Sequence, residues 1–399
     1  IILVIIILFE KLRFLKINRG KIMKKIMSFI VGGLFLFLLA GCEDPKSAKK
    51  QSSTSSGEVK TLKCQTVLNA KGDEVIMLKD FTDTVTKLTG GTLQFEIMPA
   101  GTVVGVKETL DAVDKGLIDC GFAWTHYWSG EHPAAMLFGS PVAGAGVGID
   151  NIAFLSWFLS GGGEQLYDQL WKEMNRNIKG FMLQPVGPEA LGWFPEPIKN
   201  MDDFRKLKFR TPPGIPGQTY KDIGIASVAM GGGDILPALE AGTIDAAEWC
   251  CPKPDMVFGF QKVLKHYYLQ GLHQVVVNAD FYITGTTYEK FSDHEKNSIK
   301  VAADASLMKS LARRILVNGE ALHELTTKHG VQLHDTPKDY FVEYMAAANA
   351  TLNKNANKNA FFKKVWDSQK KFADTAVPFW AGAQMSNAQL GMAHAATLK

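Results

Sequence analysis

Two short stretches of the chain end in residues that could bind a small anion. After Gly242, a short apolar run ends at Glu248-Trp249, which places a carboxylate beside a large aromatic. Arg210 ends a second strand, predicted for 207–210, and a loop rich in proline and glycine follows it. A guanidinium is a planar fork that can hold a carboxylate with two hydrogen bonds. We therefore predict a carboxylate site. The alternatives are a structural ion pair for Glu248, a core position for Trp249 and an exposed Arg210.

Three aromatic residues follow an earlier strand-like run. They are Trp124, Tyr127 and Trp128, and they follow a strand-like run whose sequence matches the run that ends at Glu248. Aromatic walls suit a small organic acid because they exclude water from its polar contacts. We predict that these three side chains face the same site as Arg210. The alternative is that they pack between lobes.

A repeated element would position these residues. The segments TLDAVDKGLIDCGFAW, from Thr109, and ILPALEAGTIDAAEW, from Ile235, each read as a helix closed by a glycine and followed by a short strand. Glycine suits the left-handed position after a helix. The matching positions are Gly116 with Gly242 and Asp119 with Asp245. The repeat predicts two α/β lobes with mostly parallel sheets. Ligands of such sheets bind beyond the carboxyl ends of the strands, so the site residues should line a cleft between the lobes.

The last hundred residues read as helices. Ser292 and Glu295 have the spacing of a capping box, and a long helix is predicted to follow. Pro337 occupies a typical first-turn position for the next helix. Long helices after two α/β lobes are predicted to brace the lobes or to form a dimer contact.

The N-terminal region reads as a targeting segment. A basic start at Met23-Lys24-Lys25 precedes an apolar run over 26–40, which is short for a membrane span and typical of a signal peptide. The run ends in a Leu-Ala-Gly-Cys sequence that resembles a bacterial lipobox, which implies cleavage before Cys42 and a lipid on its sulfur. An uncut signal anchor is the alternative. Residues 1–22 are interpreted as an upstream extension, and the polar, serine-rich 43–60 as a flexible tether.

Charge and cysteine content narrow the possible partners. The chain of 399 residues has a net charge of +4, but residues 1–41 carry seven cations and one anion, so the remainder is slightly acidic. Nucleic acid is therefore not an expected partner. No CxxC pair is present in the sequence, which argues against a zinc site of that kind. Cys64 and Cys120 lie on candidate strands, where they either form a disulfide or remain two buried thiols.

The motifs of common enzymes are missing from the sequence. It contains no P-loop and no Gly-x-Ser-x-Gly, and the glycines at 144, 146 and 148 have the wrong spacing for a dinucleotide loop. We find no pairing of a nucleophile with a base, so no catalytic residue and no catalytic cofactor are predicted.

From about Thr61 to the C-terminal helices, the chain resembles the solute-binding proteins of TRAP transporters, the DctP family, and within it the α-keto acid-binding, TakP-like subgroup. The resemblance rests on four stretches taken in order: PAGTVVGVKETLDAVDKGLIDCGFAW, LSGGGEQLYDQLW, GWFPEPIKNMDDFRKLKFRTPPG and MGGGDILPALEAGTIDAAEWCCPKPDMVFGFQKVLKHYYLQGLH. It implies an α/β, two-lobed periplasmic binding protein fold (type II-like). It also implies capture of an organic acid for a sodium-coupled permease, with a helix-exchanged homodimer plausible.

The resemblance also implies roles for individual residues. By position, Arg210 corresponds to the carboxylate-pairing arginine, and Glu248 and Trp249 to a pair that supplies metal ligands, Trp249 through its backbone. Asp280 falls near a position that is often acidic in the family and is a further candidate ligand. Glu189 stands where the subgroup places a metal-binding glutamine.

That departure at Glu189 bears on the identity of the cation. With glutamine, the site of Glu248, Arg210 and a bound monocarboxylate has one excess negative charge, which Na⁺ would neutralise. An ionised Glu189 adds a second excess negative charge, and a divalent cation would neutralise both. Hard oxygen ligands suit Ca²⁺. The hypothesis is therefore Ca²⁺ in place of the family's Na⁺. The alternatives are a protonated Glu189, because two close carboxylates resist joint ionisation, or a misalignment by one residue.

The expected protein is an extracytoplasmic, lipid-anchored receptor for a 2-oxo or 2-hydroxy acid that docks on TRAP permease subunits and is not an enzyme. A secreted metal-dependent hydrolase or lyase on the same scaffold and a sensor-associated binding subunit are the alternatives. The predicted divisions are 1–41 (extension and signal), 42–60 (lipidated cysteine and tether), 61–185 (lobe 1), 186–290 (lobe 2) and 291–399 (helical segment).

Overall fold

The computed structural model describes residues 58–397. The signal-like segment, Cys42 and nearly all of the predicted tether lie outside the described residues. Within the described part of the chain, none of the helices is both long enough and apolar enough to span a membrane.

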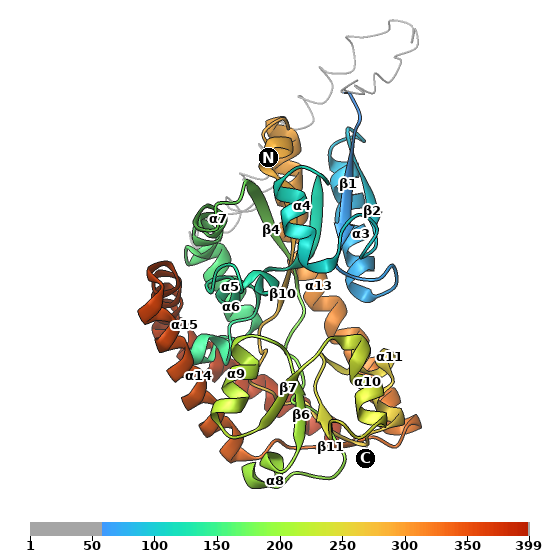
Figure 1. Cartoon of the computed structure of the whole chain (residues 1–399), viewed down its shortest axis with the longest axis vertical. Helices are drawn as coiled ribbons and strands as arrows, with labels where there is room; N and C mark the ends of the chain where they lie inside the picture. The colour runs from blue at the N-terminus through green and yellow to red at the C-terminus, as the bar shows by residue number, and fades with distance from the viewer. Residues whose placement is uncertain (1–57, 398–399) are drawn as a thin grey trace, which may run out of the picture. The chain divides into compact units, whose positions relative to one another are not determined.

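The first sheet has five strands in the order β2-β1-β3-β10-β4 (Figure 1). β1 runs parallel to β2 and β3, whereas β10 runs antiparallel to β3 and β4. The strands are β1 (Lys60–Thr66), β2 (Leu93–Met98), β3 (Cys120–Trp124), β4 (Ile178–Pro185) and β10 (Asn278–Thr284). The neighbouring helical elements are α3 (Asp73–Leu88), η1 (Val106–Glu108), α4 (Thr109–Asp114), η2 (Thr125–Trp128), α5 (Ala135–Gly139), η3 (Gly144–Gly148), α6 (Asn151–Ser160), α7 (Gly163–Glu173) and α12 (Gly285–Tyr288).

The second sheet has six strands in the order β11-β9-β5-β8-β6-β7. β5 is antiparallel to both of its neighbours, and the remaining pairs are parallel. The strands are β5 (Gly192–Phe194), β6 (Lys208–Thr211), β7 (Ala226–Ala229), β8 (Ala246–Ala247), β9 (His266–Tyr268) and β11 (Gln332–His334). The helices beside them are α8 (Met201–Arg205), α9 (Ile215–Asp222), α10 (Gly232–Glu240), α11 (Pro252–Phe258) and η4 (Phe260–Lys262).

The predicted repeat is present in three dimensions. Helix α4 leads into β3 and helix α10 into β8, and the glycine after each helix has positive φ, 71° at Gly116 and 67° at Gly242. The matching aspartates also make matching contacts. Asp119 accepts a hydrogen bond from the Lys63 amide at 2.9 Å, and Asp245 accepts one from the Lys208 amide at 2.7 Å. Each aspartate thus joins the start of its own strand to the neighbouring central strand.

One strand lies in a different lobe from the one that the sequence boundaries implied. β10 falls within 186–290, the predicted lobe 2, but it pairs with β3 and β4 in the first sheet. All seven of its residues are buried, because it lies between two other strands. The chain therefore crosses back to the first sheet after β9. Where the two crossing segments meet, the Val186 amide donates to the Val277 carbonyl at 2.7 Å. Both sheets are mixed, with more antiparallel pairing than predicted.

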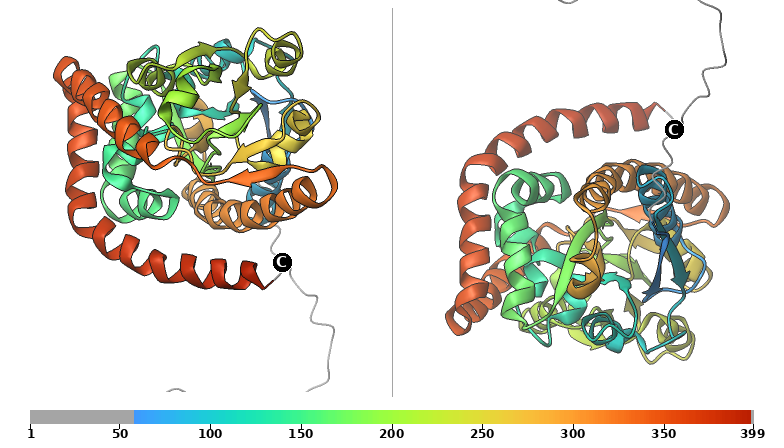
Figure 2. Two further views of the ribbon diagram at one scale, coloured as in Figure 1. Left: turned by 90° about the horizontal axis from the view of Figure 1, so that it is seen from below. Right: turned by 90° about the horizontal axis from the view of Figure 1, so that it is seen from above.

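The C-terminal region is helical, as predicted. It comprises α13 (Asp293–Lys328), α14 (Lys338–Lys358) and α15 (Ala360–Ala396). The capping box between Ser292 and Glu295 is formed at the start of α13. This helix contacts α3 and β4 of the first lobe and α11 of the second, so it spans both (Figure 1). The last part of α15 extends past the other helices, as both views in Figure 2 show.

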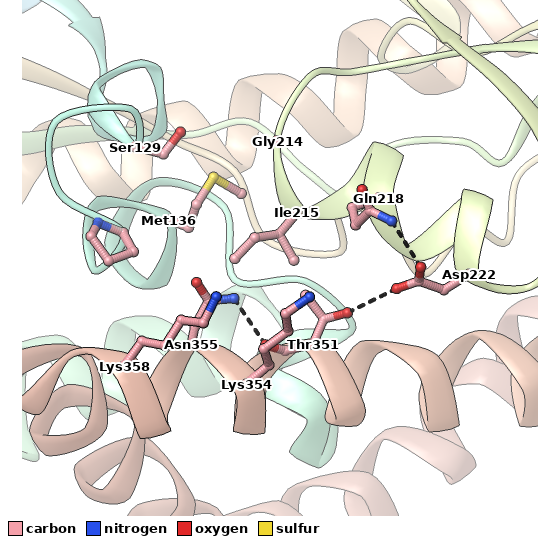
Figure 3. Close-up of a pocket in the computed structure, with 11 residues that line it drawn as sticks. Ser129, Met136, Gly214, Ile215, Gln218, Asp222, Thr351, Lys354, Asn355 and Lys358 are labelled. Atoms are coloured by element: carbon pink, nitrogen blue, oxygen red, sulfur yellow. Dashed lines mark hydrogen bonds between the residues drawn. The ribbon is translucent and has the colours of Figure 1, made fainter.

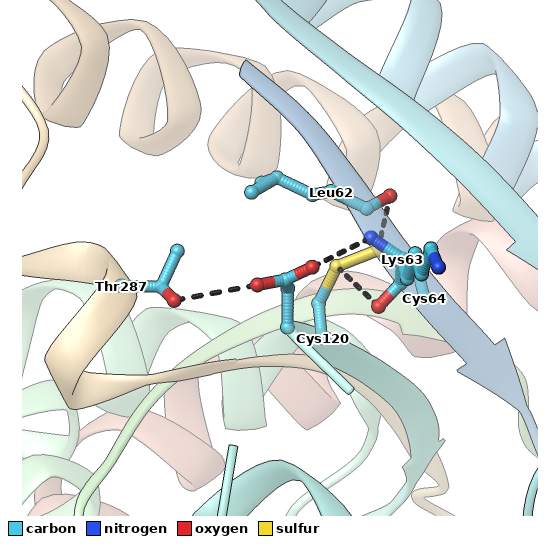
Figure 4. The surroundings of a disulfide bond; sticks show 6 residues. Leu62, Lys63, Cys64, Cys120 and Thr287 are labelled. Carbon is cyan, nitrogen blue, oxygen red and sulfur yellow. Dashed lines mark hydrogen bonds between the residues drawn. A yellow bond between two sulfur atoms is a disulfide. The ribbon is translucent and has the colours of Figure 1, made fainter. Parts of the chain in front are cut away.

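Cys64 and Cys120 form a disulfide between neighbouring strands (Figure 4). The two residues are direct partners in the parallel register of β1 and β3, with Cα atoms 4.4 Å apart. Both are buried. Of the two states that the sequence left open, the structure has the disulfide.

Candidate ligand-binding site

Arg210 lies in β6 and is buried, with 4% of its surface exposed. Its Nη1 donates to the Glu248 carboxylate at 2.5 Å and to the Glu248 carbonyl at 2.9 Å. Its Nε and Nη2 both donate to the Met230 carbonyl, at 3.2 and 3.0 Å. These bonds use four of the five N–H groups of a guanidinium and leave one, on Nη2. The predicted proximity of Arg210 and Glu248 is therefore present, and the ion pair that stood as the alternative for Glu248 is present with it.

Two carboxylates and one imidazole converge next to this ion pair. Glu248 Oε2 lies 3.4 Å from His273 Nε2, and Glu189 Oε2 lies 3.8 Å from the same nitrogen. All three side chains are buried, and these three atoms have no hydrogen-bond partner. The group meets the distances expected of ligands to one metal ion. Buried unpaired oxygens are costly, so this arrangement fits a bound cation.

Backbone hydrogen bonds hold the three side chains in place. The Glu189 amide donates to the Gln274 carbonyl at 3.0 Å, and the Ala190 amide donates to the Cys250 carbonyl at 2.7 Å. The loop that carries Glu189 is thus joined to the segment after His273 and to the segment after Glu248. Positions that are far apart in the sequence are fixed by main-chain contacts.

The two carboxyl groups have opposite pKa shifts. Burial, reinforced by the charge of Glu248, raises the pKa of Glu189 well above its usual range. Burial alone would also raise the pKa of Glu248, but Arg210 and His273 outweigh it and lower that pKa. These opposite directions favour the ionised form of Glu248, beside Arg210, and the protonated form of Glu189.

Of the four predicted aromatic residues, Trp249 contacts the cluster directly and Trp124 packs against the same small apolar group as Trp249. The Arg210 guanidinium lies 5.2 Å from the Trp249 ring, within the range of a cation–π contact. Tyr127, with 45% of its surface exposed, makes no hydrogen bond to the cluster, although burial of its hydroxyl and the charge of Glu189 raise its pKa to about 12 while Arg210 opposes the shift. Trp124 lies 5.3 Å from the Tyr127 ring and shares a small apolar cluster with Trp249.

Trp128 and Asp280 lie elsewhere. Trp128 is buried and donates to the Tyr282 hydroxyl on β10 at 3.4 Å, so it packs within the first lobe, neither at the predicted site nor between the lobes. Asp280 accepts from the same hydroxyl at 3.3 Å, and burial raises its pKa well above the usual range. Asp280 is not in the group formed by Glu189, Glu248 and His273. Its position on β10, in the first sheet, accounts for this difference.

The sequence analysis did not identify His273 or the two tyrosines behind it. The Tyr220 hydroxyl lies 3.1 Å from His273 Nδ1 and 3.1 Å from the Tyr340 hydroxyl. These residues come from an irregular segment, α9 and α14. No motif or spacing in the sequence connects these three residues, and His273 stands beside other polar residues in its segment, so its role was not signalled by the sequence.

A separate cavity of about 310 Å³ lies between the loop after η2, the start of α9 and the end of α14 (Figure 3). On one side Gln218 donates to Asp222 at 2.8 Å, and Thr351 donates to the same carboxylate at 3.3 Å. None of the predicted ligand-binding residues lines this cavity.

Comparisons with known proteins place this geometry in context. The family model of the bacterial extracellular solute-binding proteins, family 7 (DctP), matches residues 65–359. A monocarboxylate 2-oxoacid-binding periplasmic protein of Nostoc is 30% identical over 292 residues, which cover 72% of this chain and 77% of the relative.

Solved structures show the same fold. A TRAP solute-binding protein of Bordetella bronchiseptica, a dimer with copurified calcium and picolinate, superposes with a TM-score of 0.78 at 25% identity, covering 86% of this chain and 100% of the other. A protein of Pseudoalteromonas atlantica with sodium and pyruvate gives 0.75 at 22% identity, covering 83% and 99%. A protein of Colwellia psychrerythraea with calcium and pyruvate gives 0.76 at 23% identity, covering 84% and 99%.

A second buried carboxylate supports the segment that follows Glu248. Asp255 accepts hydrogen bonds from Trp193 and Tyr267 on one oxygen, both at 2.9 Å, and from the Cys250 amide on the other at 3.0 Å. Burial raises its pKa to about 7, and these hydrogen bonds oppose the rise. Three donors thus need both of its oxygens as acceptors.

Replacing Asp255 with asparagine should lower the free energy of unfolding by about 2–3 kcal/mol, because whichever way the amide turns its NH₂ group faces a donor. Urea unfolding followed by tryptophan fluorescence measures this change. Asp83→Asn, at an exposed position on α3, is the matched control, with an expected change within about 0.5 kcal/mol. Equal stability of the two variants would contradict the supporting role of Asp255.

Proposed function

The chain belongs to the DctP family of bacterial extracellular solute-binding proteins, and we propose that it captures a small 2-oxo or 2-hydroxy carboxylate together with a cation. The observation that carries the proposal is the convergence of Arg210, Glu248 and Glu189, with two carboxylate oxygens buried and unpaired. In such a site an anion can be contacted by the arginine on one side and by a cation bound to the two glutamates on the other. The work of the receptor is binding and lobe closure, and the closed form is offered to the TRAP permease subunits.

Arg210 and Glu248 change partners in this proposal. In the structure Arg210 donates two hydrogen bonds to Glu248 and two to the Met230 carbonyl, which leaves one N–H available. Glu189 and Glu248 would hold the cation, with the Trp249 carbonyl as a further ligand. The bound cation supplies positive charge that one oxygen of the acid can also contact. The cation then compensates the charge of Glu248 in place of the guanidinium. Arg210 can therefore donate its N–H groups to the carboxylate of the acid.

Charge balance favours a divalent cation. Glu189, Glu248, Arg210 and a monocarboxylate together carry two excess negative charges when both glutamates are ionised. A neutral buried site is strongly favoured, so a divalent ion is expected, and oxygen ligands alone favour Ca²⁺. Among the similar structures, one has bound sodium and pyruvate and another has bound calcium and pyruvate, which is consistent with an ion that varies among proteins of this fold.

We also propose that the protein works outside the cytoplasm on a lipid anchor at Cys42. The family is extracellular, and the lipobox-like sequence before Cys42 supports the anchor. Binding without turnover is expected, because the family and the related structures are transport receptors. Mass spectrometry of the acid released from purified protein, with metal content measured on the same sample, tests both the ligand class and the cation.

A homodimer is the third part of the proposal. Phe379, Leu390 and Met392 on α15 are more than two-thirds exposed, at 75%, 71% and 73%. Apolar side chains on an extended helix gain stability when a second surface covers them. A second copy of the chain is the proposed cover.

Arg210→Ala should weaken pyruvate binding by about 30-fold or more, since removal of one partner of a buried charge pair costs about 2–5 kcal/mol. Isothermal titration calorimetry measures the affinity. Arg210→Lys keeps the charge while removing the planar fork, and it should also bind weakly while staying folded. Arg205→Ala, on α8, is the control. Wild-type affinity in both Arg210 variants would remove this residue from the site.

Glu189→Gln should change the ion that supports binding from a divalent ion to sodium, because the substitution removes one negative charge. Pyruvate titrations of chelator-treated protein in sodium buffer, with and without Ca²⁺, measure the effect. The wild type should need Ca²⁺, whereas the variant should bind in sodium alone. Glu240→Gln, at an exposed position on α10, should behave like the wild type. If the wild type binds at full affinity without any divalent ion, the charge argument is wrong.

Truncation after Ala373 should convert a dimer to a monomer, because it removes the exposed apolar part of α15. Light scattering coupled to size-exclusion chromatography measures the mass. Phe379→Ser combined with Leu390→Ser is a milder change in the full chain and should shift the mass in the same direction. A monomeric wild type at micromolar concentration would refute the dimer.

A further inference from the structure

His273 has an unsatisfied nitrogen that faces the two site carboxylates. The residue is fully buried, and its Nε2 has no hydrogen-bond partner. The nearest carboxylate oxygens are Glu248 Oε2 at 3.4 Å and Glu189 Oε2 at 3.8 Å. Both separations exceed the roughly 2.7–3.2 Å of a good hydrogen bond, so the three atoms face one another without bonding.

The same separations suit ligands of a common ion. Ligand atoms that lie about 2.0–2.4 Å from a Zn²⁺ or Ca²⁺ ion are about 3–5 Å from one another. The ligand atoms of Glu189, Glu248 and His273 all lie within 4.8 Å of each other. A water molecule also fits a space of this size, so the experiment must measure whether His273 Nε2 itself binds the ion.

A hydroxyl pair fixes the other side of the imidazole. His273 Nδ1 lies 3.1 Å from the Tyr220 hydroxyl, which in turn lies 3.1 Å from the Tyr340 hydroxyl. The Leu272 amide donates to Tyr340 at 3.0 Å and anchors the pair. When Nδ1 donates its hydrogen to Tyr220, Nε2 presents a lone pair to the carboxylates. Metal-binding histidines typically have such an outer partner, which sets both tautomer and orientation.

We propose that His273 Nε2 is a third direct ligand of the cation, beside Glu189 and Glu248, and that it makes this a mixed nitrogen–oxygen site. The inference rests on the proposed function and extends its ligand set. A neutral imidazole leaves the charge balance unchanged, so the ion stays divalent. Imidazole binds zinc well, whereas calcium prefers oxygen. The site should therefore bind Zn²⁺ more tightly than Ca²⁺, and the difference should depend on His273.

Bound metal is first removed from the purified full-length chain with a chelator. The Zn²⁺ affinity is then measured by competition with a chromophoric chelator, and the Ca²⁺ affinity by calorimetry. His273→Gln should lower the Zn²⁺ affinity by about tenfold or more while changing the Ca²⁺ affinity by less than about threefold, because an amide oxygen replaces nitrogen. Tyr220→Phe, which removes the outer partner of a positioned ligand, should lower the Zn²⁺ affinity by about 10–100-fold. Imidazole scattering in the X-ray absorption spectrum of the zinc-loaded wild type should be present and should be lost in His273→Gln.

A second histidine pair provides the control. His266 and His334 lie 2.8 Å apart at the edge of the second sheet and could take up zinc adventitiously. His266→Gln should leave the tight zinc site unchanged, whereas a loss of zinc in this variant would overturn the assignment. Unchanged Zn²⁺ affinity and spectrum in His273→Gln would also overturn it. If cation-dependent pyruvate binding persists in that case, the proposed function stands without this ligand. If the wild type binds neither pyruvate nor a divalent ion, the proposed function itself fails.

Discussion

The buried contact between Arg210 and Glu248 determines the arrangement of the rest of the site. Two opposite charges in a place that excludes water are stable only when paired, and four hydrogen bonds hold the guanidinium against Glu248, just after β8, and the Met230 carbonyl. One oxygen of Glu248 is satisfied in this way and the other is not. That unpaired oxygen lies beside Glu189 and His273, and this arrangement favours the binding of a cation. The proposed acid binding and the proposed cation therefore both follow from this arrangement of buried charges.

Residues around the Arg210–Glu248 pair stabilise this arrangement of buried charges. Glu189 can stay protonated, since burial and its neighbour raise its pKa. Asp255, with three donors, holds the segment that follows Glu248. Trp249 covers the guanidinium on one side. This internal pairing compensates the buried charge of Glu248, and the proposed mechanism exchanges these partners when an acid and a cation bind.

The features that sequence alone could predict are those encoded locally. Gly116 and Gly242 mark the helix ends because positive φ favours glycine, and the matching aspartates follow from the same repeat. Arg210 and Glu248 could be found because each ends a strand. The return of β10 to the first sheet depends on pairing between distant segments, and this pairing removed Asp280 from the site. His273 was missed for a related reason, since its partners come from two helices remote in sequence.

The way in which the chain passes between its two sheets restricts how the lobes can move. Two extended segments, joined by the Val186–Val277 hydrogen bond, cross beside the continuous α13, which touches α3 on one side and α11 on the other. A straight pulling apart would break all of these connections at once, whereas a twist about the crossing strands would strain only a few backbone torsions. These connections therefore favour a twist about the crossing segments over a direct separation of the lobes. If ligand binding is coupled to such a motion, its equilibrium constant contributes to the affinity, and we expect substitutions at the crossing to change affinity without contacting the ligand.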